Sequence, residues 1–176
     1  MDTLNTREKV IVAVFGSANA GKSTAIMELA NRFPFNGKPK PIYSQSDDDG
    51  YVTDVVLKGD FTSELTGKKA SLGICSYGDD RQALENYFLP FVIENCDVIV
   101  VACHNLVEVD GNTYNFIDEV ALNHNYRLLT TSILRDDYVR WEKEGLSLGH
   151  SAFHVNGVNI NEIFAENMIN LIKSIV

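Results

Sequence analysis

An eight-residue segment near the amino terminus has the residue types and the spacing that bind phosphate groups. It fits the pattern G-x-x-x-x-G-K-[ST] at every position, and its residues are Gly16, Ser17, Ala18, Asn19, Ala20, Gly21, Lys22 and Ser23. Glycine lets such a loop curl so tightly that successive backbone N–H groups point into one concavity. We expect Lys22 to reach the β- and γ-phosphates of a bound polyphosphate, and the Ser23 hydroxyl to ligate Mg²⁺.

The elements on either side of this loop are those that a phosphate site needs. Residues 10–15 form a continuous apolar, largely β-branched run, which predicts a strand buried on both faces. Residues 23–33 have apolar side chains at helical spacing and are followed by Pro34, so they predict an amphipathic helix that ends there. The free N–H groups and positive dipole end of this helix would face the phosphates, and Thr24 in its first turn joins the expected binding set.

Strand, glycine-rich loop and helix in this order resemble the Walker A segment of the P-loop nucleoside triphosphatase superfamily. The resemblance covers residues 10–33 and is at the level of the superfamily. It implies a nucleoside triphosphate as ligand, Mg²⁺ as cofactor, and phosphoryl chemistry at the β–γ bond.

The composition fits one soluble domain over residues 1–176. The net charge is −9, which argues against a nucleic-acid partner because phosphate neutralisation needs a basic face. No apolar run approaches the roughly 20 residues that span a bilayer, and the polar start lacks the core of a signal peptide, so we expect no membrane partner and a cytoplasmic location. The three cysteines, Cys75, Cys96 and Cys103, lack metal-binding spacing and are expected to be buried and reduced.

The rest of the chain predicts an α/β fold. Strands are expected at 51–58, 69–76, 97–103 and 126–133, and helices at 79–95, 112–125 and 159–176. Residues 35–50 predict a loop with a short extended stretch at 41–44, and residues 136–149 a mixture of helix and loop. The link between strands 51–58 and 69–76 is too short for a crossover helix, so these two should pair antiparallel. The whole predicts a three-layer α/β/α sandwich with a mostly parallel, five-stranded sheet and the P-loop NTPase fold.

Ligands in such folds sit where the parallel strands end, so an acidic residue there would complete the metal site. Asp79, after strand 69–76, is the first candidate for Mg²⁺, and Asp80 is the substitute. Either residue could instead cap the helix that begins there, and each could do one of the two jobs. Arg81 lies next to them and would supply positive charge to the transferring phosphoryl group, or would simply be a solvated surface arginine. Lys22, Asp79 and Arg81 are thus the candidate catalytic residues.

Other polar residues have weaker cases. His104 and Asn105 follow strand 97–103 and could sense the γ-phosphate, or could be ordinary polar residues at a strand end. Arg135 and Arg140 could belong to a lid, or could be surface arginines. The acidic run at residues 47–49, followed by Gly50, lacks the remaining spacing of a calcium loop and predicts an exposed turn.

The sequence leaves the use of the nucleotide open. Residues 76–81 lie at a position similar to switch II of GTPases, but Cys75 stands where the D-x-x-G aspartate would be. The guanine-reading N-K-x-D motif is also missing, although Asp136 could still approach a base, so ATP is preferred to GTP. Three functions remain, namely slow hydrolysis, phosphoryl transfer to a small acceptor, and a nucleotide-dependent switch. The segment between Pro34 and Tyr51 is too short and polar for the helical acceptor-binding insert of nucleotide kinases.

Overall fold

The computed structural model describes residues 8–16, 21–104, 113–132 and 160–176. The helices and strands follow one another as β1 (Lys9–Gly16), α1 (Lys22–Arg32), β2 (Lys40–Ser46), β3 (Val52–Thr62), β4 (Lys69–Cys75), α2 (Arg81–Ala83), the π-helical turn η1 (Leu84–Phe88), α3 (Leu89–Ile93), β5 (Val98–His104), α4 (Thr113–Asn123), β6 (Tyr126–Ser132) and α6 (Ile160–Ile175). Each predicted strand and helix within these ranges is present, with ends that differ by a few residues.

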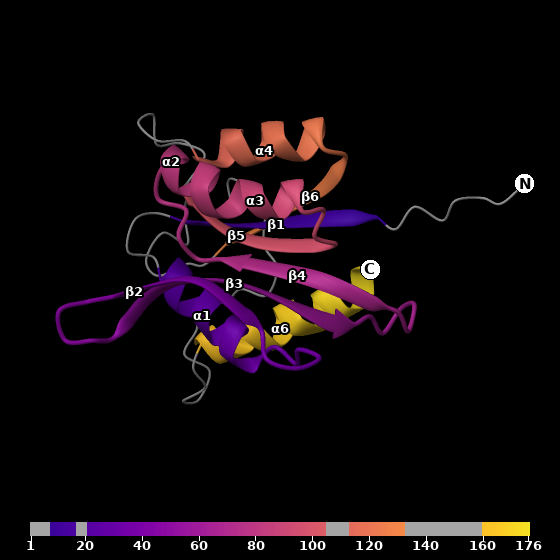
Figure 1. Ribbon diagram of the computed structural model, residues 1–176, viewed down its shortest axis with the longest axis horizontal. Helices are drawn as coiled ribbons and strands as arrows, with labels where there is room; N and C mark the ends of the chain where they lie inside the picture. The colour runs from indigo at the N-terminus through magenta and orange to yellow at the C-terminus, as the bar shows by residue number, and fades with distance from the viewer. Residues whose placement is uncertain (1–7, 17–20, 105–112, 133–159) are drawn as a thin grey trace, which may run out of the picture.

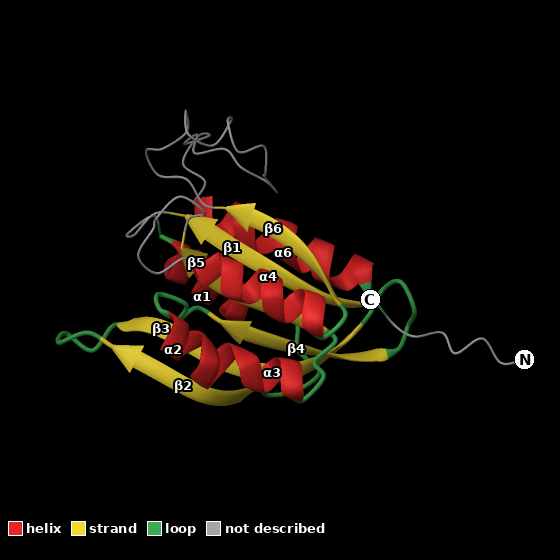
Figure 2. Ribbon diagram, turned by 90° about the horizontal axis from the view of Figure 1, so that it is seen from above, coloured by secondary structure: helices red, strands yellow, loops and turns green. Residues whose placement is uncertain are grey.

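The described strands form one mixed sheet in the order β2-β3-β4-β5-β1-β6. Strands β4, β5, β1 and β6 are parallel neighbours, and their arrowheads point the same way in Figure 2. Strand β3 pairs antiparallel with β4, as the short connection between them predicted, and also with β2. The amino end of β3 therefore lies at the edge of the sheet where the parallel strands end, and this places Asp54 near Ser23 at the start of α1.

The predicted count of five strands is wrong, because β2 makes a sixth strand in the described residues. Strand β2 is an edge strand whose side chains are exposed except for Tyr43, which is half-buried. An edge strand with water on both faces has no apolar alternation, and Pro41 resembles a loop signal, so the sequence predicted only a short extended stretch here. The acidic run that follows forms an exposed turn, as the sequence predicted, and this turn joins β2 to β3. In it the Asp47 carboxylate accepts hydrogen bonds from two backbone N–H groups.

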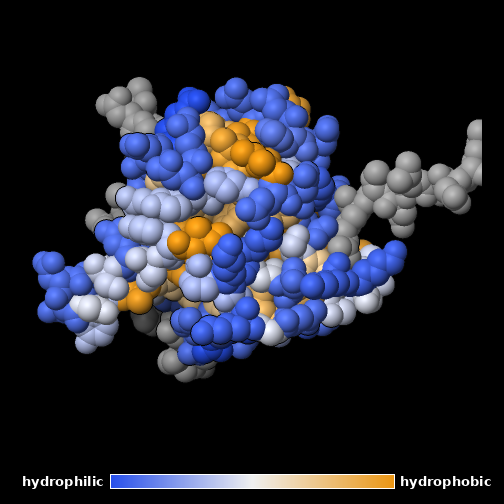
Figure 3. Space-filling view, in the orientation of Figure 1, coloured by the Kyte–Doolittle hydropathy of each residue, from blue (hydrophilic) through white to orange (hydrophobic). Residues whose placement is uncertain are grey.

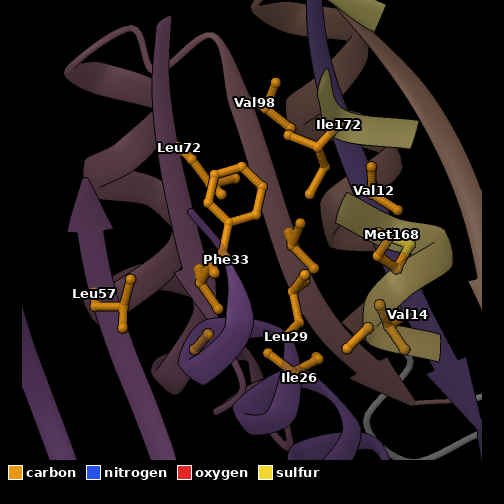
Figure 4. Close-up of a cluster of buried hydrophobic side chains, with 14 of the residues drawn as sticks. Val12, Val14, Ile26, Leu29, Phe33, Leu57, Leu72, Val98, Met168 and Ile172 are labelled. Atoms are coloured by element: carbon orange, nitrogen blue, oxygen red, sulfur yellow. The ribbon is translucent and has the colours of Figure 1, made fainter. Parts of the chain in front are cut away.

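Helices cover both faces of the sheet, so the architecture is an α/β sandwich (Figure 1). One face packs against α1 and α6, and the other packs against α2, η1, α3 and α4. Strand β1 supplies buried side chains to both cores in alternation, as a central strand should: Val10, Val12 and Val14 to the first, and Ile11, Ala13 and Phe15 to the second. Figure 4 shows the first core, where Ile26 and Leu29 of α1 and Met168 and Ile172 of α6 meet the sheet.

The helical segment before β5 contains a π-helical turn, η1, between α2 and α3. Pro90 lies at the start of α3, directly after the π-helical turn. Leu84 and Phe88 of this turn pack in the second core.

The remaining features of the fold are the hydropathy of its surface and the burial of its cysteines. Figure 3, in the orientation of Figure 1, shows apolar residues in separate patches divided by hydrophilic residues, as is ordinary for a folded domain. The three cysteines are buried, as predicted. Within the described residues, no helix is long and apolar enough to cross a membrane.

Candidate phosphate-binding site

The glycine-rich segment joins the end of β1 to the start of α1. Gly16 is the last residue of β1, and Gly21 precedes α1 with a φ of +92°, a conformation that L side chains rarely adopt. The spacing of the motif thus places a glycine where the backbone needs one. Ser17, Ala18, Asn19 and Ala20 lie outside the described residues.

Lys22 is buried at the start of α1, with only 6% of its surface exposed. Its Nζ donates a hydrogen bond of 3.0 Å to the Gly16 carbonyl, so the ammonium group lies over the beginning of the loop. The first turn of α1 contains no acidic residue. The positive end of the helix and the lysine therefore act together on the same region, which favours a bound anion. Thr24 is exposed in the same turn.

Ser23 connects α1 to the amino end of β3 and to the carboxyl end of β4. Its hydroxyl lies 3.3 Å from the Ser76 carbonyl oxygen and within hydrogen-bonding reach of the Asp54 carboxylate. The Ser76 hydroxyl in turn donates to Asp54 over 2.9 Å and accepts from the Val55 backbone N–H over 2.8 Å. Three oxygen-bearing side chains from α1, β3 and the end of β4 thus meet in one place.

Asp54 is a buried carboxylate that the sequence analysis missed. Only 9% of its surface is exposed. Burial raises the pKa of its carboxyl, hydrogen bonds from Ser23 and Ser76 act in the opposite direction, and the charge of Asp79 adds to the rise. The predicted antiparallel pairing was the available signal, since it brings the start of β3 to the edge where β4 ends.

Of the two roles that the sequence left open for Asp79 and Asp80, the structure shows the helix cap, which is Asp80. The Asp80 carboxylate accepts a hydrogen bond of 2.7 Å from the Ala83 N–H and so caps the helix. Asp79 has an exposed side chain, and its Oδ1 lies 3.5 Å from Nε2 of His104. Gly78 fixes this loop against β5, because a Cβ there would lie 1.8 Å from the Ala102 carbonyl oxygen.

The other predicted residues lie at different distances from the loop. His104 ends β5 and is in register with Gly16 on the neighbouring β1, so it stands beside the start of the glycine-rich loop. Its backbone N–H donates to the buried Thr113 hydroxyl. Arg81 instead contacts Glu85 at 2.8 Å and lies over the Phe116 ring, toward α4. Asn105, Arg135, Asp136 and Arg140 fall outside the described residues.

The oxygen atoms of Ser23 and Asp54 are the kind of ligand that Mg²⁺ prefers. Within the described ranges, no group of three or more His, Cys, Asp or Glu residues could hold a metal by itself. Mg²⁺ in proteins is commonly held by one or two side chains together with phosphates and water, so the pair fits that mode of binding.

No family model matches the sequence, and no curated protein is significantly similar to it.

Proposed function

We propose that this chain binds a nucleoside triphosphate with Mg²⁺ at residues 16–24 and hydrolyses it slowly. The proposal includes the P-loop NTPase fold for the sandwich described above. ATP is the preferred nucleotide, because the sequence lacks a guanine-reading motif. The β- and γ-phosphates would lie against Lys22 and the amino end of α1.

The observation that carries this proposal is the position of Lys22. Its ammonium group is buried and bonded to the Gly16 carbonyl at the opening of the loop. The buried ammonium group and the positive end of α1 concentrate positive charge at the opening of the loop. Phosphate oxygens would supply opposite charge at this position, and Lys22 would hold the β- and γ-phosphates as a point charge.

Mg²⁺, when bound, would neutralise charge on the β- and γ-phosphate oxygens. Ser23 would offer its hydroxyl oxygen to the ion. His104, which is held near Asp79, lies beside the loop and could orient a water molecule for attack on the γ-phosphate. His104 and Asp79 make only a long contact and Arg81 is turned toward α4, so we expect slow turnover in the absence of a partner.

Calorimetric titration with ATP and with GTP tests nucleotide binding. We expect saturable binding to the wild type, tighter for ATP, and a large loss in Lys22→Ala. Equal affinities of the two proteins would remove Lys22 from the site. Phosphate release with Mg²⁺ tests turnover, for which we expect a rate below about 1 s⁻¹, the low end for ordinary enzymes.

A nucleotide-dependent switch is the second candidate, and the contacts of the segment 76–80 favour it. Its Ser76 carbonyl faces the Ser23 hydroxyl, and its Tyr77 ring lies against Tyr43 of β2 and Tyr87 of η1. A change at Ser23 on nucleotide binding could therefore reach the edge strand. Hydrogen exchange of β2 with and without nucleotide would detect this, and unchanged exchange would argue for a plain hydrolase.

A further inference from the structure

Asp54 occupies a position in the site that no other described carboxylate shares. It lies near the start of β3, the strand that runs against its neighbours, and the Val55 carbonyl accepts a hydrogen bond from the Ser76 N–H just after β4 ends. The carboxylate accepts from the Ser76 hydroxyl and lies within reach of the Ser23 hydroxyl. Asp54 is therefore the buried acid in contact with the serine of the phosphate-binding motif.

Among the described residues, the side chains that donate hydrogen bonds to this carboxylate are the hydroxyl groups of Ser76 and Ser23. No lysine, arginine or histidine of the described ranges forms an ion pair with Asp54, whose neighbouring polar groups are the Ser23 and Ser76 hydroxyls and the carboxylate of Asp79. Removing a carboxylate from water is costly unless opposite charge or several hydrogen bonds compensate for it. A cation next to Ser23 would supply the opposite charge at this point.

The Ser23 hydroxyl explains why a carboxylate is useful here. A hydroxyl has one proton and two lone pairs, so it can bind a metal ion with a lone pair only if its proton points elsewhere. A carboxylate accepts that proton better than the Ser76 carbonyl does, because a charged acceptor makes the stronger hydrogen bond. Asp54 would therefore turn the Ser23 oxygen toward the ion.

The alternative acids are less suited to this role. Asp80 is already the helix cap, and Asp79 has an exposed side chain directed to His104. An exposed carboxylate keeps most of its hydration and gains less from a cation than a buried one does.

We infer that Asp54, and not Asp79, is the carboxylate that positions Ser23 and balances the charge of Mg²⁺ at this site. The inference rests on the proposed binding of a nucleotide with Mg²⁺. It makes Asp54 a positioning residue of the metal site and leaves Asp79 to orient His104.

The test compares affinity for a non-hydrolysable ATP analogue in Mg²⁺ and in EDTA for four proteins. They are the wild type, Asp54→Asn, Asp79→Asn and Asp97→Asn, where Asp97 provides a matched carboxylate that bonds a serine at the opposite end of the sheet. We expect Mg²⁺ to tighten binding to the wild type and Asp54→Asn to lose at least about 10-fold of that gain. Its affinity in EDTA should stay within about 3-fold of the wild type. The other two variants should keep the full Mg²⁺ gain.

The outcomes separate the two proposals. If Asp54→Asn keeps the Mg²⁺ gain, or Asp79→Asn loses it, the assignment to Asp54 is wrong while nucleotide binding stands. If the wild type binds the analogue in neither condition, the proposed function fails and the assignment falls with it. Circular dichroism checks that each variant is folded, and Asp54→Ser serves as a second neutral variant if Asp54→Asn is not.

Discussion

Two aspartate–serine pairs lie at opposite ends of the sheet, and they differ in what else they touch. At one end, Asp97 before β5 accepts from both the N–H and the hydroxyl of Ser71 in β4, at 2.7 and 2.9 Å, and its own N–H donates to that hydroxyl. At the other end, Asp54 accepts from the Ser76 hydroxyl and also meets Ser23 of the glycine-rich loop.

The comparison distinguishes a structural pair from a candidate site. The Asp97–Ser71 pair has reciprocal hydrogen bonds that join two neighbouring strands, and it is half-buried. The Asp54–Ser76 pair is more deeply buried and has one additional hydroxyl, which belongs to a helix that begins at Lys22. Identical side-chain chemistry is therefore expected to stabilise the sheet at one end and to serve a ligand at the other.

The largest difference between the two ends of the sheet should be in how much their lysines contribute to ATP affinity. Lys22→Ala should weaken ATP binding by about 100-fold, because it removes a charge-assisted contact worth about 2–3 kcal/mol. Lys9→Ala is the matched control at the other end of β1, where Lys9 bonds to Asn95. Calorimetry measures both, and an equal loss in the two variants would contradict a phosphate site at the Lys22 end.

Gly78→Ala should destabilise the site end of the sheet. Its Cβ would lie 1.8 Å from the Ala102 carbonyl oxygen, so the backbone must move at a cost of about 2–3 kcal/mol. Gly67→Asn, in the β3–β4 turn at the other end, has open space and a φ of +66° that asparagine tolerates, so it should cost less than about 1 kcal/mol. Urea unfolding measures both values, and similar stabilities of the two variants would show that Gly78 is not tightly packed.

The aspartates should differ in stability in the absence of nucleotide and Mg²⁺. Asp97→Asn should lower the free energy of unfolding by about 1–2 kcal/mol, because the Ser71 N–H and hydroxyl both depend on its carboxylate. Asp54→Asn should change it by less than about 1 kcal/mol, since it removes a buried charge and keeps an acceptor oxygen. Urea unfolding measures both values. If Asp54→Asn lowers the free energy of unfolding more than Asp97→Asn does, Asp54 is the structural residue.

The buried cysteines at both ends of the sheet should be inaccessible to thiol reagents in the native protein. Burial raises the pKa of Cys75 and of Cys103, near the site, to about 12, and it also raises the pKa of Cys96 near the other end. At pH 8 these thiols stay protonated, so a thiolate-specific reagent should modify them at least about 100-fold more slowly than in urea. Fast native labelling of Cys75 or Cys103 alone would show that the site end opens.

Much of the fold could be predicted because local patterns were strong. The apolar run of β1, the helical spacing of α1 and α6, and the short β3–β4 connection each predicted what the structure contains. Strand β2 was predicted only in part, because an edge strand exposed on both faces has no hydrophobic period. The strand order could not be predicted, since it depends on how distant segments pack.

In the candidate site, two local features agree with what the motif predicted. The glycine at position 21 has the conformation that the motif implies, and Lys22 points to the loop. Asp54 could not be found from a motif, because it is a single acid inside a predicted strand. Its role depends on pairing between strands that brings it to Ser76 and Ser23, and such a contact has no local signature in the sequence.

Nucleotide binding at the glycine-rich loop is the central claim, and a crystal structure with a non-hydrolysable ATP analogue and Mg²⁺ tests it most directly. The account predicts that Lys22 Nζ leaves the Gly16 carbonyl, its partner at 3.0 Å, and bonds phosphate oxygens. It also predicts metal density beside the Ser23 hydroxyl. Absence of the analogue at saturating concentration, or binding elsewhere with Lys22 still bonded to Gly16, would contradict it.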